Sequence, residues 1–113
     1  MSKNYPELLN DLSPYLKDFR TNSSDVITSF FDIKTSALKK GALDEKTKTL
    51  IALAIAVAQR CEPCLAHYTK VFIDLGGTKQ ELIEMLNVAV LMGGGPSVMY
   101  TAEALRAFDQ FSS

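Results

Sequence analysis

Two cysteines, Cys61 and Cys64, are the residues of this chain best suited to chemistry, because they lie three positions apart at the predicted start of a helix. Pro63 stands between them and suits the first turn of a helix. Free backbone N–H groups and the helix dipole stabilise a thiolate at such a position, and two cysteines at this spacing can close a small disulfide. The motif therefore predicts a redox-active dithiol.

The single histidine of the chain, His67, follows Cys64 by three positions and lies on the same side of the predicted helix. An imidazole there can accept the thiol proton and later return it. Two other interpretations stay open. Zinc is one, although two Cys and one His leave tetrahedral coordination one ligand short unless an oligomer supplies it. The other is a pair of buried thiols beside an ordinary helix histidine.

Composition excludes several classes of function. The chain has 113 residues, 47% of them hydrophobic and 22% charged, which predicts one globular domain over residues 1–113. The net charge is −1 and the Lys and Arg residues are dispersed, so the sequence predicts no basic patch that would bind nucleic acid. The longest apolar run, Leu50 to Ala58, is far shorter than the roughly 18 residues of a membrane span.

The N-terminal segment contains no pattern of a signal peptide, so we expect a cytoplasmic protein that binds neither membrane nor nucleic acid. The cytosol is reducing and disfavours a static structural disulfide. No motif for a cofactor is present, and the Gly93-Gly94-Gly95 triplet lacks the preceding strand that a phosphate-binding loop requires. We read the triplet as a tight turn between helices.

The elements that must position the cysteines are all helical, because apolar residues recur at helical spacing and no strand pattern is present. Caps, prolines and glycines divide the chain into about six helices. The expected segments are Tyr5 to Phe19 with an interruption at Ser13-Pro14, Ser23 or Ser24 to Lys40 before Gly41, Asp44 to Arg60, Pro63 to Gly76-Gly77, the Thr78–Glu81 capping box to Gly93, and Pro96 to Phe111.

The helix that contains Leu50 to Ala58 is apolar on every side, and the segment from Glu81 to Met92 is nearly so. A helix without a polar face must be buried all round, which is hard to achieve within one small subunit. These two segments therefore predict a homo-oligomer whose interface covers part of them. The alternative is a central helix enclosed by its own neighbours.

Several segments in order resemble the carboxymuconolactone decarboxylase-like superfamily and its alkyl hydroperoxidase D-like (AhpD-like) branch. They are Glu45-Lys46-Thr47-Lys48 before an Ala/Ile/Leu helix, CEPCLAHYTK at residues 61–70, Gly76-Gly77, and NVAVLMGGGPSVMY at residues 87–100. The likeness covers about residues 43–108, with residues 1–40 as N-terminal helices outside it. It implies an all-α domain that forms trimers or hexamers.

In the AhpD-like branch the two Cys reduce hydroperoxides or a partner's disulfide, with an external thiol or dithiol as reductant. The resemblance implies that Cys64 attacks and Cys61 resolves, although the residues alone also permit the reverse. The family pattern has a Glu and a His at the positions held here by Thr49 and Tyr68. Two interpretations stay open. In one the relay is displaced, with His67 and Tyr68 at one end and Glu45, one helical turn before Thr49, as its acid. In the other no relay works, and Glu45 is an ordinary surface residue favoured by the helix dipole.

The leading hypothesis is an antioxidant peroxidase that works through a Cys61–Cys64 dithiol/disulfide cycle, with His67 as proton acceptor and Tyr68 and Glu45 as accessory site residues. One alternative is a lactone decarboxylase of the carboxymuconolactone type, which needs no Cys pair. Another is a non-catalytic oligomer that senses redox state or binds a metal.

Overall fold

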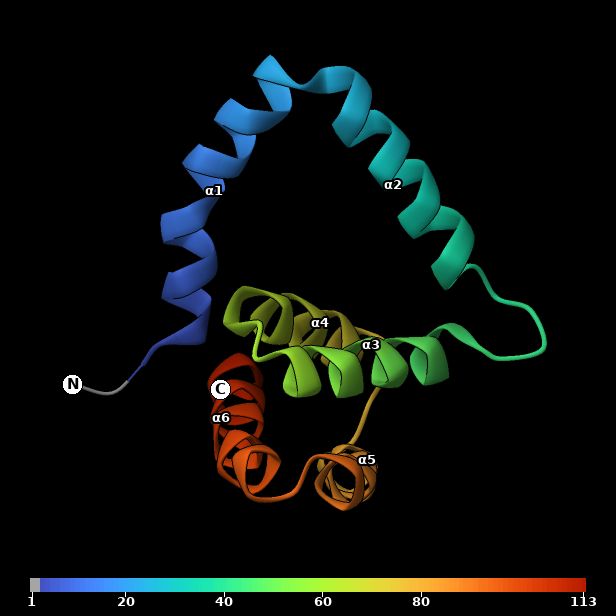
Figure 1. Cartoon of the computed structure of the whole chain (residues 1–113), viewed down its shortest axis with the longest axis vertical. Helices are drawn as coiled ribbons and strands as arrows, with labels where there is room; N and C mark the ends of the chain where they lie inside the picture. The colour runs from blue at the N-terminus through green and yellow to red at the C-terminus, as the bar shows by residue number, and fades with distance from the viewer. Residues whose placement is uncertain (1–2) are drawn as a thin grey trace.

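A computed structural model describes residues 3–113, and these residues form six α-helices with no β-strand among them (Figure 1). The helices are α1 (Tyr5–Asn22), α2 (Ser24–Leu38), α3 (Glu45–Gln59), α4 (Glu62–Asp74), α5 (Lys79–Gly93) and α6 (Gly95–Ser112). The predicted all-α fold class is thereby confirmed. None of the described helices is both long enough and apolar enough to cross a membrane.

Helices α3 to α6 pack into a body, and the first turns of α1 lie against α4 and α6 (Figure 1). The side chain of Tyr5 is fully buried, and its hydroxyl donates a 2.7 Å hydrogen bond to Glu103 Oε1. The core brings together residues of α1, α3, α4, α5 and α6: Tyr5, Leu53, Val57, Leu65, Ala66, Phe72, Leu82, Leu86, Ala104 and Ala107. This core holds the start of α4, where the cysteines lie, from several sides.

Local caps explain where the helices of the body begin. The Asp44 carboxylate accepts a 2.7 Å hydrogen bond from the Thr47 amide at the start of α3. Thr78 and Glu81 form the reciprocal capping box of α5. Both predicted caps are confirmed, since each side chain satisfies a backbone N–H that the helix leaves free.

The predicted interruption at Ser13-Pro14 is wrong, because α1 runs through Pro14 without a break. A proline inside a helix removes the hydrogen bond to the carbonyl four residues earlier, here Asn10. Both Asn10 and Pro14 are exposed, so water can satisfy the carbonyl that is left free.

The end of α2 also differs from the prediction, since the helix stops at Leu38 rather than at Lys40. The backbone of Lys39 is extended, and its carbonyl accepts a 2.5 Å hydrogen bond from Lys48 Nζ of α3. A cation from another helix thus takes the place of the helical continuation. Ser23 holds the N-cap position as expected but makes no side-chain capping bond.

Helices α1 and α2 form an open arch that stands away from the body (Figure 1). None of the described residues of α2 is buried. Large apolar side chains are exposed on the arch and on the body: Tyr15, Leu16, Phe19, Val26, Phe30, Phe31, Ile33, Ile51, Ile55, Val88, Leu91, Met92, Val98 and Met99. Within one chain the apolar helix α3 is therefore covered on one side only.

Candidate redox site

The two cysteines lie where α3 turns into α4. Arg60 ends α3 in the left-handed conformation, with φ 58°, and its guanidinium donates 2.8 Å hydrogen bonds to the carbonyls of Val57 and Ala58. The Cys61 amide donates to the Ala56 carbonyl at 3.0 Å. These bonds secure a sharp turn that delivers Cys61 to the first position before α4.

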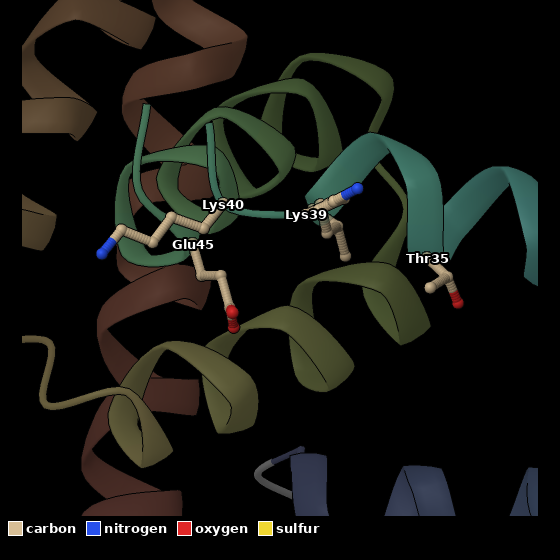
Figure 2. Close-up of a pocket in the computed structure, with 5 residues that line it drawn as sticks. Thr35, Lys39, Lys40 and Glu45 are labelled. Atoms are coloured by element: carbon tan, nitrogen blue, oxygen red, sulfur yellow. The ribbon is translucent and has the colours of Figure 1, made fainter. Parts of the chain in front are cut away.

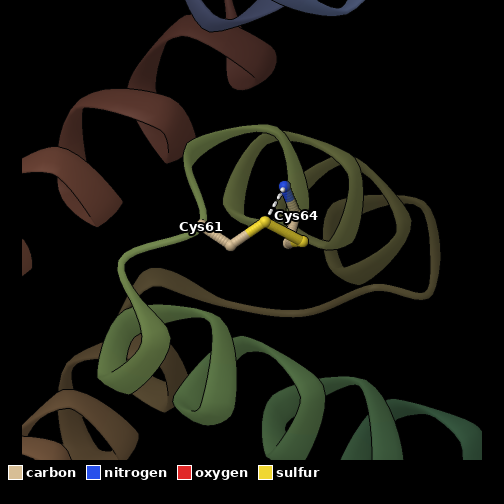
Figure 3. The surroundings of a disulfide bond; sticks show 2 residues. All are labelled: Cys61 and Cys64. Atoms are coloured by element: carbon tan, nitrogen blue, oxygen red, sulfur yellow. Dashed lines mark hydrogen bonds between the residues drawn. A yellow bond between two sulfur atoms is a disulfide. The ribbon is translucent and has the colours of Figure 1, made fainter.

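Cys61 is the N-cap of α4, and Cys64 follows in its first turn. The two are joined by a disulfide with a Cα–Cα separation of 5.2 Å (Figure 3). The Cys64 amide donates a 3.3 Å hydrogen bond to Cys61 Sγ, drawn as a dashed line in Figure 3. The same amide would stabilise a Cys61 thiolate after reduction, because a free N–H at a helix start favours negative charge.

His67 lies on α4 as predicted, and its ring is half-buried. Its Nε2 atom is 2.9 Å from Nζ of Lys34, which comes from α2. The ring also packs edge-on against Tyr68, with centroids 4.8 Å apart. Burial of the ring lowers the pKa of His67 from its usual value of 6.5, and the positive charges of Lys34 and Lys70 lower it further. Both effects favour the neutral form of the imidazole.

Lys34 is the site residue that sequence reasoning missed. It precedes His67 by 33 positions and looks like an ordinary surface lysine of an amphipathic helix. No local pattern distinguishes it from the other lysines of the chain. Only the path of α2 back toward α4 reveals the contact.

Tyr68 lies beside His67 and lines a groove of about 440 Å³ between α2, α3 and α4. The ammonium group of Lys34 is 5.7 Å from the centre of the Tyr68 ring, within the range of a cation–π interaction. The other residues of the groove are mostly apolar: Phe30, Ile33, Ala37, Leu38, Leu43, Lys48, Ile51, Ala52 and Ile55.

Glu45 lies apart from this cluster. It is exposed in the first turn of α3 and lines a separate pocket with Thr35, Leu38, Lys39 and Lys40 (Figure 2). Thr49 is buried, and its hydroxyl donates a 2.8 Å hydrogen bond to the Glu45 carbonyl. Cys61, Cys64, His67 and Tyr68 thus all lie at the N-cap or in the first two turns of α4, whereas Glu45 lines a different pocket.

The described residues contain no group of three or more His, Cys, Asp or Glu side chains that could hold a metal ion. Among these residues, Cys61, Cys64 and His67 do not form such a group. A dithiol is the chemistry that the arrangement supports.

Comparisons with known proteins agree with this fold. A family model described as the carboxymuconolactone decarboxylase family matches residues 25–107. An uncharacterised protein of Cupriavidus necator is 33% identical over 87 residues, which is 77% of this chain and 77% of that protein. An uncharacterised protein encoded in the cox locus of Paracoccus denitrificans is 30% identical over 82 residues, or 73% of this chain and 74% of that protein.

Solved structures extend the likeness to three dimensions. The apo form of a carboxymuconolactone decarboxylase family protein from Legionella pneumophila is 44% identical, with a TM-score of 0.96 over 99% of this chain and 100% of that one. A family protein of Thermotoga maritima, described as having a possible part in the antioxidative response, is 24% identical, with a TM-score of 0.70 over 76% of this chain and 89% of that one. This second likeness shows the fold alone. The match over most of the chain places this protein in the carboxymuconolactone decarboxylase family.

Proposed function

We propose that this protein is a thiol-dependent oxidoreductase of the AhpD-like type, which reduces hydroperoxides or a partner's disulfide. The observation that carries the proposal is the Cys61–Cys64 pair at the start of α4, with the Cys64 amide on Cys61 Sγ. A helix N-terminus favours the thiolate, which is the nucleophilic form of cysteine. Family membership supports the proposal, because the family resemblance implies this chemistry for chains with the Cys pair.

In the proposed cycle the Cys64 thiolate attacks the outer oxygen of a hydroperoxide. The O–O bond breaks, Cys64 becomes a sulfenic acid, and the alkoxide leaves with a proton as an alcohol. The Cys61 thiol then attacks the sulfenic sulfur, which releases water and closes the disulfide. Two equivalents of an external thiol, or one dithiol, reopen it by thiol–disulfide exchange and are themselves oxidised. We place this cycle in the cytoplasm, where such reductants are available.

His67 is the candidate for proton transfer at Cys64, because it stands one helical turn beyond it on α4. Tyr68 packs against His67 and can orient its ring. Glu45 is a weaker candidate for proton transfer, since it lines a different pocket.

A second candidate function is lactone decarboxylation, which is the activity that the family's name describes. Such a reaction does not need a dithiol. Turnover of a lactone substrate that survives replacement of both cysteines with serine would therefore separate the two functions. A third possibility is a redox sensor or metal-binding module. Zinc bound stoichiometrically to the purified protein, and lost when either cysteine is replaced, would favour it.

The direct test of the leading proposal follows the thiols of the reduced protein. A slight excess of hydrogen peroxide or an organic hydroperoxide is added, free thiols are blocked at intervals, and the products are identified by mass spectrometry. We expect rapid formation of the Cys61–Cys64 disulfide with consumption of one peroxide per chain. Thiols that stay free while the peroxide persists would contradict a peroxidase, and the same assay with small disulfides would then test the reductase.

We also propose that the protein is a homo-oligomer, a trimer or hexamer. The side chains of Phe30 on α2 and Ile55 on α3 are about half exposed, at 55% and 50%. Apolar patches of this extent on one chain are typical of subunit interfaces. These residues lie on the arch and on the helix next to it in Figure 1.

Light scattering after size exclusion is expected to give a mass several times the 12.4 kDa of one chain. A charge in the apolar face should weaken association, so Phe30→Asp is expected to shift the mass downward. Thr28→Asp is the matched control, because Thr28 lies on the opposite, polar side of α2. A wild-type mass of one chain at micromolar concentration would refute the proposal.

A further inference from the structure

The contact between Lys34 and His67 joins the arch to the candidate redox site. Lys34 is half-buried on α2, and its Nζ atom is 2.9 Å from His67 Nε2 on α4. The same ammonium group lies 5.7 Å from the Tyr68 ring centre and 6.0 Å from that of Phe31. The ion pairs of the described residues do not include Lys34, so the imidazole and the two rings are the partners that hold it.

This contact determines which ring nitrogen of His67 carries the proton. A lysine ammonium has three N–H donors and no acceptor. The Nε2 atom that faces it must therefore offer a lone pair, and the proton of the neutral ring must be on Nδ1. The charged groups that act on the ring, Lys34 from α2 and Lys70 from α4, are both cationic and oppose a second proton.

His67 lies on α4 one helical turn after Cys64. Side chains on a helix lean toward its N-terminus, so a residue covers the turn before its own Cα. For His67 that turn contains Cys64, three positions earlier. With Nε2 occupied by Lys34, Nδ1 is the ring nitrogen left for this turn, and in this tautomer it is an N–H donor.

We propose that Lys34 is a positioning residue for disulfide exchange: it holds His67 in the Nδ1–H tautomer, so that His67 donates a proton to Cys64 as the disulfide opens. This reverses, for the disulfide form, the acceptor role that the sequence suggested for His67. The two sulfurs then have different donors, because Cys61 Sγ already accepts from the Cys64 amide.

An external thiolate attacks Cys61 Sγ and forms a mixed disulfide, while the bond between Cys61 and Cys64 breaks. The electron pair of that bond stays on Cys64 Sγ, which takes the proton from His67 Nδ1. As Nδ1 gives up its proton, Nε2 takes one from the Lys34 ammonium, and the proton that the reductant's thiol lost on ionising returns to Lys34 through the solvent. A second thiol of the reductant then releases Cys61 and is oxidised with the first.

The tautomer can be read directly, because His67 is the only histidine of the chain and gives one set of imidazole signals. We would record two-bond ¹H–¹⁵N correlations of the ¹⁵N-labelled, oxidised full chain across a pH titration. The wild type is expected to show Nδ1–H, with a midpoint below 6.5. In Lys34→Met we expect the Nε2–H form that free histidine favours, and a midpoint that moves up toward 6.5.

Two further variants separate positioning from a merely structural role. Lys34→Arg should restore the Nδ1–H form, since a guanidinium also donates and never accepts. Lys70→Met is the matched control, because it removes a cation that is not hydrogen-bonded to the ring, so it should raise the midpoint without changing the tautomer. A Lys34→Met spectrum that keeps Nδ1–H overturns the assignment.

The role of Lys34 in disulfide exchange rests on the proposed function, and the rate of disulfide reduction tests it separately. Reduction of the disulfide by a small dithiol at pH 7 is expected to slow by at least roughly 10-fold in Lys34→Met, as for the loss of a general acid. A changed tautomer with an unchanged reduction rate overturns the role in exchange. Failure of the protein to react with peroxide would refute the peroxidase while leaving the tautomer result intact.

Discussion

Replacement of Cys64 with serine is expected to abolish hydroperoxide turnover, with a rate at least about 1,000-fold below the wild type. The proposed cycle begins with attack by the Cys64 thiolate, and a serine hydroxyl at pH 7 is neither ionised nor comparably nucleophilic. The measurement is peroxide consumption with a dithiol as reductant. A Cys64→Ser variant that turns over like the wild type would contradict the proposed order of attack.

Cys61→Ser is the companion variant, because it removes the resolving thiol and keeps the attacking one. Cys64 should then be oxidised once and remain as a sulfenic acid that a dimedone-type reagent traps for mass spectrometry. Multiple turnover should be lost, since no disulfide can close within the chain. If the adduct forms on Cys61 of Cys64→Ser instead, Cys61 is the attacking residue, which the hydrogen bond from the Cys64 amide to its sulfur would explain.

Phe72→Ala is expected to lower the free energy of unfolding by about 3–5 kcal/mol, the usual cost of removing a buried aromatic side chain. Phe72 is fully buried on α4, in the same core that supports the turn with the cysteines. Urea unfolding followed by circular dichroism measures the loss, at matched protein concentration because association stabilises the folded state. Phe72→Leu should lose clearly less. Equal losses in the two variants would show that ring packing is not the cause.

A substitution at Gly77 tests the packing around the Phe72 ring more specifically. A Cβ at Gly77 would overlap the Phe72 ring, whereas its φ lies outside the positive range that only glycine favours. Gly77→Ala should therefore cost about 1–3 kcal/mol by overpacking. In the Phe72→Ala background the ring is absent, so the same change should cost little. Additive losses in this double-mutant cycle would contradict the proposed clash.

Much of the fold could be predicted from the sequence because its signals are local. The Asp44 cap and the Thr78–Glu81 capping box join residues three positions apart, so the sequence alone reveals them. The break expected at Pro14 failed for a different reason. Proline removes one hydrogen bond, and whether the helix continues depends on the exposure of the Asn10 carbonyl, which is a property of the assembled chain.

The candidate site likewise has a part that follows from local spacing and a part that depends on packing between helices. The spacing of Cys61, Cys64 and His67 places them on the first turns of one helix, and the structure has them there. The sequence therefore determined the dithiol and the family. The tertiary structure decided what surrounds it: Glu45 lies in another pocket, and Lys34 reaches His67 from a helix 33 positions away in the chain. Contacts within a helical turn follow from backbone geometry, whereas contacts between distant helices depend on how those helices pack, which short-range patterns do not encode.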